Sequence, residues 1–309
     1  MKYLFGPVNS RRLGKSLGID LMPYKTCTLD CVYCECGKTT NLTNTIAEYV
    51  PTDDVLREID EFLSTAPELD VVTFSGSGEP TLHANIGKII SHIKEKYPRY
   101  KIAVLTNGTL LWHENVRHAL LNANIVIPSL DAATFDVFSK ILRNASDVTV
   151  EHLVEGLTAF AKEYRGRLYI EVFIVEGIND TAEELQKIKN ICLDVKPSAV
   201  QLNTLDRPGT ESWVNPLDEE RLLEIKEFFA PLDVSLSLRP GLPYLSAAYN
   251  ADMKEAITST LMRRPSTAEE LALQMGFRLN EVQKILAVMI GAGTVKIEKM
   301  ERGEFFSLN

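Results

Sequence analysis

The sequence predicts an α/β protein with a mostly parallel sheet and a second, smaller C-terminal unit. Two observations predict the sheet: short apolar, β-branched runs recur along the chain, and amphipathic stretches separate them. A third observation concerns residues 253–309, where short helical stretches and a hairpin follow a segment rich in proline and glycine. We therefore expect a first domain over residues 1–245 and a second over residues 246–309.

Six stretches have the composition of buried parallel strands, and several are almost continuously apolar, as expected when helices cover both faces of a sheet. The predicted strands are Leu17–Met22, Leu69–Ser75, Ile102–Thr106, Asn124–Leu130, Leu168–Val175 and Ala199–Thr204. The amphipathic stretches predict helices at Asp53–Leu63, Ile86–Lys96, Glu114–Leu121, Thr149–Glu163, Thr181–Val195 and Asp218–Phe229. Such a pattern fits a partial barrel or an open doubly wound sheet, and both place ligands at the carboxyl ends of the strands.

The C-terminal residues have the pattern of a winged helix. A linker at 239–243 precedes a predicted helix over 253–262, and Ser266 and Thr267 offer two overlapping capping boxes for the next helix. A further helix and a hairpin with its turn at Arg302 complete the pattern.

The charge balance limits the partners that we expect. Residues 251–309 hold eight Lys and Arg against eight Asp and Glu, so the C-terminal unit is neutral. Attraction to phosphates dominates nucleic-acid affinity, and we therefore favour substrate docking or protein contact over DNA binding as its role. The whole chain has a formal net charge of −9, which argues against a protein whose entire surface tracks nucleic acid or an anionic membrane.

Nothing in the sequence predicts secretion or insertion into a membrane. Residues 1–7 lack the apolar region of a signal peptide, and no apolar run reaches the ~18 residues of a membrane span. We therefore expect a cytoplasmic protein without a membrane partner. Inside a cell, a cluster of cysteines more often binds a metal or does redox chemistry than it forms disulfides.

Four of the five cysteines lie within ten residues, directly after the first predicted strand. Cys27, Cys31 and Cys34 have the spacing C-x3-C-x2-C. Three thiolates can hold three irons of a cubane cluster and leave the fourth iron open for a small chelating molecule. The alternative is a structural zinc site with Cys36 as the fourth ligand, although structural zinc usually takes ligand pairs that are well separated in sequence. Cys192 lies within a predicted helix, where we expect a small buried apolar residue.

These motifs resemble those of the radical S-adenosylmethionine enzymes. Tyr33 stands just before the third cysteine, as in the family motif, and Gly76-Ser77-Gly78-Glu79-Pro80 is similar to the family's Gly-Gly-Glu-Pro segment, with a serine in place of the first glycine. The segment 129–131 resembles a ribose-contacting segment of the family, and Asn107 and Asn203 also lie at predicted strand ends. The resemblance covers about residues 3–240.

The resemblance implies a partial (β/α)6 barrel with two cofactors, a 4Fe-4S cluster and S-adenosylmethionine. It implies that the cluster is ligated by Cys27, Cys31 and Cys34. We expect Cys36 to be a bystander rather than a ligand, although the sequence does not identify its role. It also implies that the cofactor-binding residues are Tyr33, Ser77, Gly78, Glu79, Asn107, Ser129, Asp131 and Asn203.

The activity that the resemblance implies is reductive cleavage of S-adenosylmethionine. An electron from a low-potential donor would break the sulfur–C5′ bond, and the resulting 5′-deoxyadenosyl radical would abstract hydrogen from a substrate. No further catalytic side chain stands out. The substrate, whether a tRNA, a peptide or a small molecule, is not identified by the sequence.

Within the family, the segment 5–14 and the Gly-Ser-Gly-Glu-Pro form of the glycine motif resemble the wyosine tRNA-base synthases. Those synthases use a second cluster, for which only Cys36 and Cys192 remain here, and they lack an obvious counterpart of the C-terminal unit. We therefore do not transfer their reaction. Two hypotheses of other classes stay open: an iron–sulfur sensor that regulates transcription through the winged helix, and a zinc-stabilised binding module.

Overall fold

The computed structural model describes residues 1–10, 12–236, 253–275, 277 and 279–309. Its centre is an eight-stranded sheet in the order β1-β2-β5-β6-β7-β8-β9-β10. β1 is antiparallel to β2, and every other neighbouring pair in this sheet is parallel. The strands are β1 (Leu4–Ser10), β2 (Gly14–Ile19), β5 (Val71–Phe74), β6 (Lys101–Thr106), β7 (Ile125–Pro128), β8 (Arg167–Phe173), β9 (Ala199–Asn203) and β10 (Val234–Leu236).

All six predicted strands are confirmed, as β2 and β5 to β9. The first of them begins at Gly14 and ends at Ile19, earlier than Met22, because the chain turns there into the cysteine-bearing loop. The two edge strands were not predicted. β1 contains a Gly-Pro pair, which is typical of a turn, and the structure accommodates this pair by a shift of register between Phe5 and Val8.

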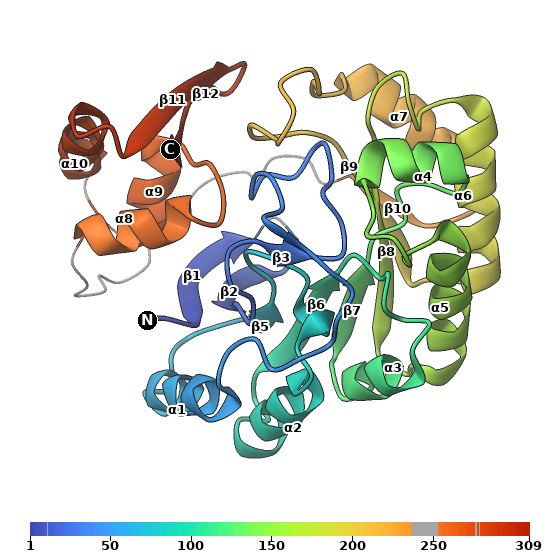
Figure 1. Cartoon of the computed structure of the whole chain (residues 1–309), viewed down its shortest axis with the longest axis horizontal. Coiled ribbons are helices and arrows are strands. Elements are labelled where there is room, and N and C mark those ends of the chain that lie inside the picture. The colour runs from blue at the N-terminus through green and yellow to red at the C-terminus, as the bar shows by residue number, and fades with distance from the viewer. Residues whose placement is uncertain (11, 237–252, 276, 278) are drawn as a thin grey trace.

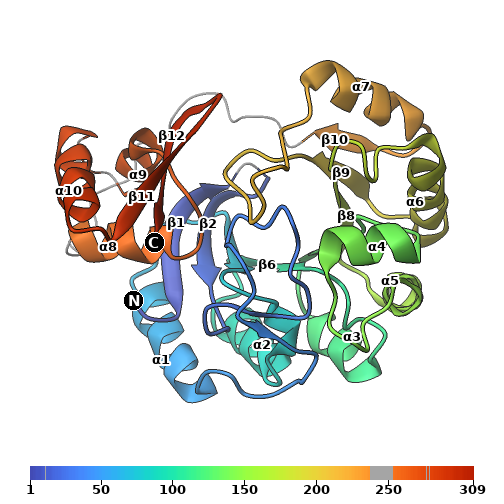
Figure 2. The same cartoon turned by 45° about the horizontal axis from the view of Figure 1, so that its top comes forward.

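The sheet curves so that distant strands face each other across its concave side. Arg12, in the turn between β1 and β2, reaches β8 and β9: its Nη1 lies 3.3 Å from Oε1 of Gln201 and also pairs with Glu171. In a flat sheet of this strand order, the strands between β2 and β9 would keep these groups far apart. The fold is therefore α/β with a mostly parallel, curved central sheet, consistent with a partial barrel (Figures 1 and 2).

Helices cover the outer side of the sheet (Figures 1 and 2). The six predicted helices are confirmed to within one residue at each end, as α1 (Thr52–Leu63), α2 (Ile86–Lys96), α3 (Glu114–Leu120), α5 (Val150–Glu163), α6 (Ala182–Val195) and α7 (Glu219–Phe228). Four short elements were not predicted: β3 (Thr26–Cys27), β4 (Asn41–Leu42), the 3-10 helix η1 (Pro80–Leu82) and α4 (Phe135–Leu142). The main core lies between these helices and the sheet, where Val55, Ile59 and Phe74 are completely buried.

The C-terminal residues form a group of helices and a hairpin with a buried cluster of its own, separate from the main core. Its elements follow the predicted order: α8 (Met253–Leu261), α9 (Ala268–Met275), α10 (Leu279–Gly291), β11 (Val295–Met300) and β12 (Gly303–Leu308). The predicted linker at 239–243 and the predicted boundary at residue 245 lie outside the described residues.

The C-terminal unit, residues 253–309, lies against the N-terminal edge of the sheet, where α8 and α9 contact β1 (Figures 1 and 2). This contact places it beside the carboxyl ends of the first strands. None of the helices in the described part of the chain is both long and apolar enough to cross a bilayer.

Candidate cofactor site at the carboxyl ends of the strands

The loop that follows β2 carries Cys27, Cys31 and Cys34, and we call residues 25–37 the cysteine loop. Its start is fixed because β3, which ends at Cys27, pairs with β4. Its middle is tied to α4, because the backbone N–H groups of Asp30 and Val32 donate to carbonyl oxygens in the last turn of that helix, at 2.9 Å in both cases. The three thiols are half-buried. The fold therefore fixes the backbone that presents them.

Cys36 and Cys192 have different surroundings. The Sγ of Cys36 lies 2.7 Å from the carbonyl oxygen of Arg263, in the C-terminal unit, and 3.4 Å from that of Gly76. Cys192 is completely buried on α6, and burial raises the pKa of its thiol to about 12, as expected for a small apolar residue.

The described side chains do not form a compact site for one metal ion. Among them, no three His, Cys, Asp or Glu residues converge as ligands of a single ion. A closed zinc site needs four ligands around one point. A cubane cluster instead binds each thiolate at a different iron, so its ligands stand further apart.

The first residue of the cysteine loop, Lys25, is a buried lysine that was not predicted from the sequence. The Nζ of Lys25 donates to Sγ of Cys34 at 2.9 Å and to the carbonyl oxygen of Gly37 at 2.5 Å. A hydrogen bond from Cys36, followed by the charge of Lys25, lowers the pKa of the Cys34 thiol to about 5. Burial instead raises the pKa of Cys27 to about 12. Since the thiolate is the form that ligates metals, Cys34 is the better prepared of these two thiols.

The segment after β5 passes directly against β3. A Cβ atom at Gly78 would lie 1.9 Å from the carbonyl oxygen of Thr26, so only glycine fits there. The neighbouring Ser77 is buried, and its Oγ and backbone N–H donate to Oδ2 of Asp20 at 2.7 Å and 3.1 Å. The serine that replaces a glycine of the family motif therefore has a definite structural partner.

Glu79 is buried and connects the ends of neighbouring strands. Its carboxylate accepts hydrogen bonds from Thr81, from Oγ1 of Thr106 at 2.6 Å and from the backbone N–H of Asn107 at 2.7 Å. Burial raises the pKa of Glu79, although these bonds act in the opposite direction. The amide of Asn107 in turn donates to Oγ1 of Thr28 at 2.8 Å. The two predicted residues therefore join the ends of β5 and β6 to the cysteine loop.

Tyr33 and Asp131 form a second connection. The Tyr33 hydroxyl donates to Oδ2 of Asp131, whose Oδ1 accepts from the backbone N–H of Phe173 at 2.7 Å, and the rings of Tyr33 and Phe173 stack with centroids 3.9 Å apart. Burial raises the pKa of Asp131 to about 6. Ser129 and Asn203 lie half-buried at the ends of β7 and β9, and within the described residues their side chains make no hydrogen bond to the cysteine loop.

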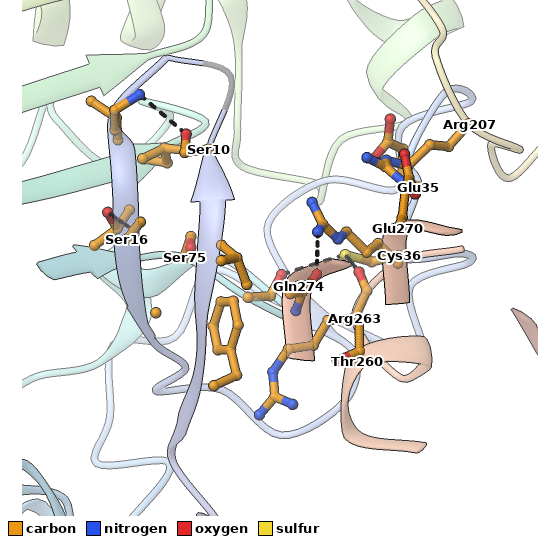
Figure 3. Close-up of a pocket in the computed structure, with 18 of the residues that line it drawn as sticks. Ser10, Ser16, Glu35, Cys36, Ser75, Arg207, Thr260, Arg263, Glu270 and Gln274 are labelled. Carbon is orange, nitrogen blue, oxygen red and sulfur yellow. Dashed lines mark hydrogen bonds and ion pairs between the residues drawn. The ribbon is translucent and has the colours of Figure 1, made fainter. Parts of the chain in front are cut away.

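A cavity of about 510 Å³ lies beside these loops, between the barrel and the C-terminal unit (Figure 3). Ser16 of β2 and Ser75 at the end of β5 line its barrel side, Cys36 lines its edge, and Thr260 and Gln274 line its other side. Ligand cavities usually measure about 300–1,000 Å³. No local pattern in the sequence indicates this cavity, because its walls come from segments that are far apart in the chain.

Ion pairs hold the walls of the cavity together. Arg207, after β9, has a side chain that is only 7% exposed and pairs with Glu35 of the cysteine loop, Nε to Oε2 at 3.4 Å, and with Glu270 of α9. Arg302 of the hairpin pairs with Glu270 and with Asp206. Burial acts to raise the pKa of Glu270, but the two arginines outweigh it, so the pKa is lowered and the pairs stay charged.

Arg263 connects the C-terminal unit to two loops of the barrel. Its Nε donates to Oδ2 of Asp20 at 3.1 Å, the same oxygen that accepts from Ser77. Its carbonyl oxygen accepts from Cys36. No local signal could have revealed this contact, since Arg263 and Asp20 are 243 residues apart.

A three-cysteine loop at the carboxyl edge of a parallel α/β sheet is an arrangement suited to an iron–sulfur enzyme. The model of the radical SAM superfamily matches residues 21–191, which is more than half of the chain and includes the cysteine loop. The chain therefore belongs to the radical SAM superfamily and is an enzyme of that class.

The chain is also similar to individual proteins. It is 35% identical over 301 residues to a protein named GTPase Obg from Brachyspira hyodysenteriae. The aligned residues are 96% of this chain but only 44% of that protein, so this chain spans less than half of that relative. It is 33% identical over 307 residues to a UPF0026 protein of Helicobacter pylori, covering 98% of this chain and 96% of the other. A solved structure, TYW1 with a lysine–pyruvate adduct bound, aligns with a TM-score of 0.53 and 16% identity over 69% of this chain and 72% of that one, which shows a shared fold.

Membership of the superfamily implies a 4Fe-4S cluster and S-adenosylmethionine, and the residues present fit both. Thiols are the usual ligands of such a cluster, and three of them lie on one loop whose backbone is fixed. The close approach at Gly78 brings a second backbone segment against that loop at the carboxyl ends of the strands. This is the edge of the sheet at which α/β folds bind their cofactors.

Proposed function

We propose that the chain cleaves S-adenosylmethionine reductively at a 4Fe-4S cluster held by Cys27, Cys31 and Cys34, and uses the resulting radical chemistry on a substrate. The cysteine loop is the observation that carries this proposal, because its three thiols lie at the carboxyl ends of the strands on a fixed backbone. When bound, the cluster supplies the electron for the cleavage, and the cofactor supplies the means of removing hydrogen from the substrate.

The predicted cofactor-binding residues divide into two kinds. The carboxylates of Glu79 and Asp131 are engaged by hydrogen bonds within the protein, so we assign them positioning roles. Ser129 and Asn203 are half-buried at strand ends, and the backbone beside Gly78 lies close to the cysteine loop. We assign cofactor contacts to these three places.

We further propose that the C-terminal unit is a winged helix that closes the substrate cavity. Its Arg263 and Glu270 are bound to residues of the barrel on two sides of that cavity. A cavity of about 510 Å³ has the size for a small molecule, a peptide side chain or a single nucleotide. Since a folded tRNA would need a wide electropositive surface and this unit is neutral, we favour a small molecule.

The relation to the wyosine synthases stays a hypothesis about the substrate, and it predicts that tRNA from a deletion strain lacks a modified nucleoside.

Two observations speak against a lysine adduct of the kind bound in TYW1. The cations that line the cavity, among the residues that the structure describes, are all arginines. In the cysteine loop itself, burial acts to lower the pKa of Lys25, but the neighbouring thiols outweigh it and raise this pKa, so Lys25 stays protonated and is a poor nucleophile.

We also propose a cytoplasmic location and a low-potential electron donor as a partner. Reducing surroundings keep the free thiols available for a cluster, and iron–sulfur clusters of this kind are reduced by one-electron donors.

Formation of 5′-deoxyadenosine tests the proposed function. The full chain would be reconstituted anaerobically with iron and sulfide and then given S-adenosylmethionine and dithionite. We expect product from the wild type and from Cys192→Ala, a control at a buried cysteine of α6 away from the site, and no measurable product from Cys34→Ala.

A fully loaded wild-type cluster that gives no product would contradict the proposal. It would favour the iron–sulfur sensor, which predicts specific DNA binding that depends on the state of the cluster, and no cleavage of S-adenosylmethionine. A colourless protein that contains zinc and no iron would favour the zinc-stabilised module.

A further inference from the structure

Lys25 is a buried cation for which the cofactor-binding motifs do not account. Lysine is seldom buried unless its charge is paired, and Lys25 is 3% exposed. Its Nζ donates to Sγ of Cys34 at 2.9 Å and to the carbonyl oxygen of Gly37 at 2.5 Å. The anionic partner of this ammonium is therefore a thiolate of the proposed cluster site.

The backbone of Lys25 is fixed on both sides. Its N–H donates to Oγ1 of Thr40 at 2.9 Å, and its carbonyl oxygen accepts from the N–H groups of Thr40 and Asn41 at 3.1 Å and 3.0 Å. The next residue, Thr26, pairs with Asn41 in the β3–β4 ladder. The ammonium is thus held at the sulfur by the fold, and little reorganisation is needed when the charge nearby changes.

The other two thiols of the site have different neighbours. The Sγ of Cys27 accepts a long hydrogen bond of 3.5 Å from Nδ2 of Asn107, which is a neutral amide. Within the described part of the chain, no Lys or Arg side chain donates a hydrogen bond to Cys27 or Cys31. Among the described residues, the hydrogen bond from this cation therefore goes to one ligand sulfur, that of Cys34, while its charge also acts over a longer range on Cys27 and Cys31.

We propose that Lys25 is a positioning residue that raises the reduction potential of the cluster by acting through Cys34. The inference rests on the proposed function, because it takes Cys34 as a ligand. Reduction adds one electron and one negative charge to the cluster, and a cation with a hydrogen bond at a ligand sulfur stabilises the reduced form more than the oxidised form. Lys25 thereby allows a weaker electron donor to reduce the cluster.

A redox titration of the reconstituted full chain, followed by electron paramagnetic resonance without S-adenosylmethionine, tests this role. We expect Lys25→Met to lower the ratio of reduced to oxidised cluster at a fixed potential about ten-fold, which is about 59 mV for one electron. Lys25→Arg keeps the cation, and we expect its ratio to stay within about three-fold of the wild type. Lys38→Met, at an exposed lysine just after the same loop, is the matched control and should change nothing.

A Lys25→Met protein with a full complement of iron and sulfide and an unchanged ratio would overturn the inference. If this variant does not load a cluster, Lys25→Gln takes its place with the same expected direction. Failure of both neutral variants to load would also overturn it, in favour of a role in assembly. Failure of the proposed function looks different: the wild type itself would hold no cluster, or the cluster would survive Cys34→Ala.

Discussion

The cofactor end of the barrel and the C-terminal unit are held in place by different kinds of interaction. At the strand ends, hydroxyls and backbone N–H groups donate to two buried carboxylates, Glu79 and Asp131. At the junction with the C-terminal unit, charged pairs predominate, with Arg263 on Asp20 and two arginines on Glu270. The site is thus built into the barrel, whereas the unit that closes the cavity is attached by ion pairs.

This difference has an energetic consequence. A carboxylate with several neutral donors loses only part of its solvation when one donor is removed, whereas a buried ion pair leaves an uncompensated charge when one partner is lost. The cavity lies where the two kinds of interaction meet, since Cys36 and Gly76 of the barrel loops and Arg263 of the C-terminal unit all line it.

The largest effect that would separate the two regions is expected from Arg263→Met. This change leaves the Asp20 carboxylate, which is 6% exposed, without its cation. Removing one partner of a buried pair costs about 3–5 kcal/mol, and we expect about 3 kcal/mol less free energy of unfolding because Ser77 still donates to Asp20. Urea denaturation of the full chain measures this loss.

Arg57→Met is the control for this prediction. Its Nη1 pairs with Oδ1 of Asp54 at 3.0 Å on the exposed face of α1, far from the junction in the chain, and we expect a loss below about 1 kcal/mol. Equal losses in the two variants would show that the pair of Arg263 with Asp20 does not hold the junction together.

An intermediate effect is expected from Gly78→Ala, on the barrel side of the comparison. The new methyl group would lie 1.9 Å from the carbonyl oxygen of Thr26 and 3.0 Å from Cβ of Met22, so the segment after β5 must move away from β3. Overpacking of this kind costs about 1–3 kcal/mol. We expect the free energy of unfolding, measured by urea denaturation, to fall by about 2 kcal/mol, together with weaker binding of S-adenosylmethionine.

The control is Gly291→Ala at the end of α10, where a Cβ meets nothing within 4 Å. Unaltered stability in Gly78→Ala would mean that this segment is not confined by β3.

Most of the barrel could be predicted from the sequence, because its signals are local. A parallel strand that is buried on both faces is a short apolar run, and each of the six such runs is a strand of the sheet. The motif residues are local too: Gly78 has no room for a side chain, and Glu79 and Asp131 are buried next to their strands. Their partners, however, could not be read from the motifs. That Ser77 would bind Asp20, and Tyr33 would bind Asp131, depends on how distant strands align.

The junction with the C-terminal unit could not be predicted, although the elements of that unit could. Its helices and hairpin follow from caps, turns and apolar spacing within a few residues. The pair of Arg263 with Asp20 joins positions that are 243 residues apart, and ion pairs have no periodic pattern in a sequence. Lys25 was missed for a related reason. A lysine ordinarily indicates an exposed position, and only the folded loop shows that its charge is paired with a thiol.

The smallest effect that we expect concerns the start of α9, where the sequence offered two capping boxes and the structure uses one. The Oγ1 of Thr267 accepts from the backbone N–H of Glu270 at 3.2 Å, and the Glu270 carboxylate accepts from the N–H of Thr267 at 3.3 Å. Thr267→Ala should therefore cost about 1 kcal/mol of the free energy of unfolding, measured by urea denaturation. The hydroxyl of Ser266 is completely buried without a hydrogen-bond partner among the described residues, so Ser266→Ala should leave the stability unchanged or raise it slightly. Because Glu270 also binds Arg207 across the junction, a loss well above 1 kcal/mol in Thr267→Ala would mean that the cap positions this carboxylate for the ion pairs, and that the two regions are less independent than their contacts indicate.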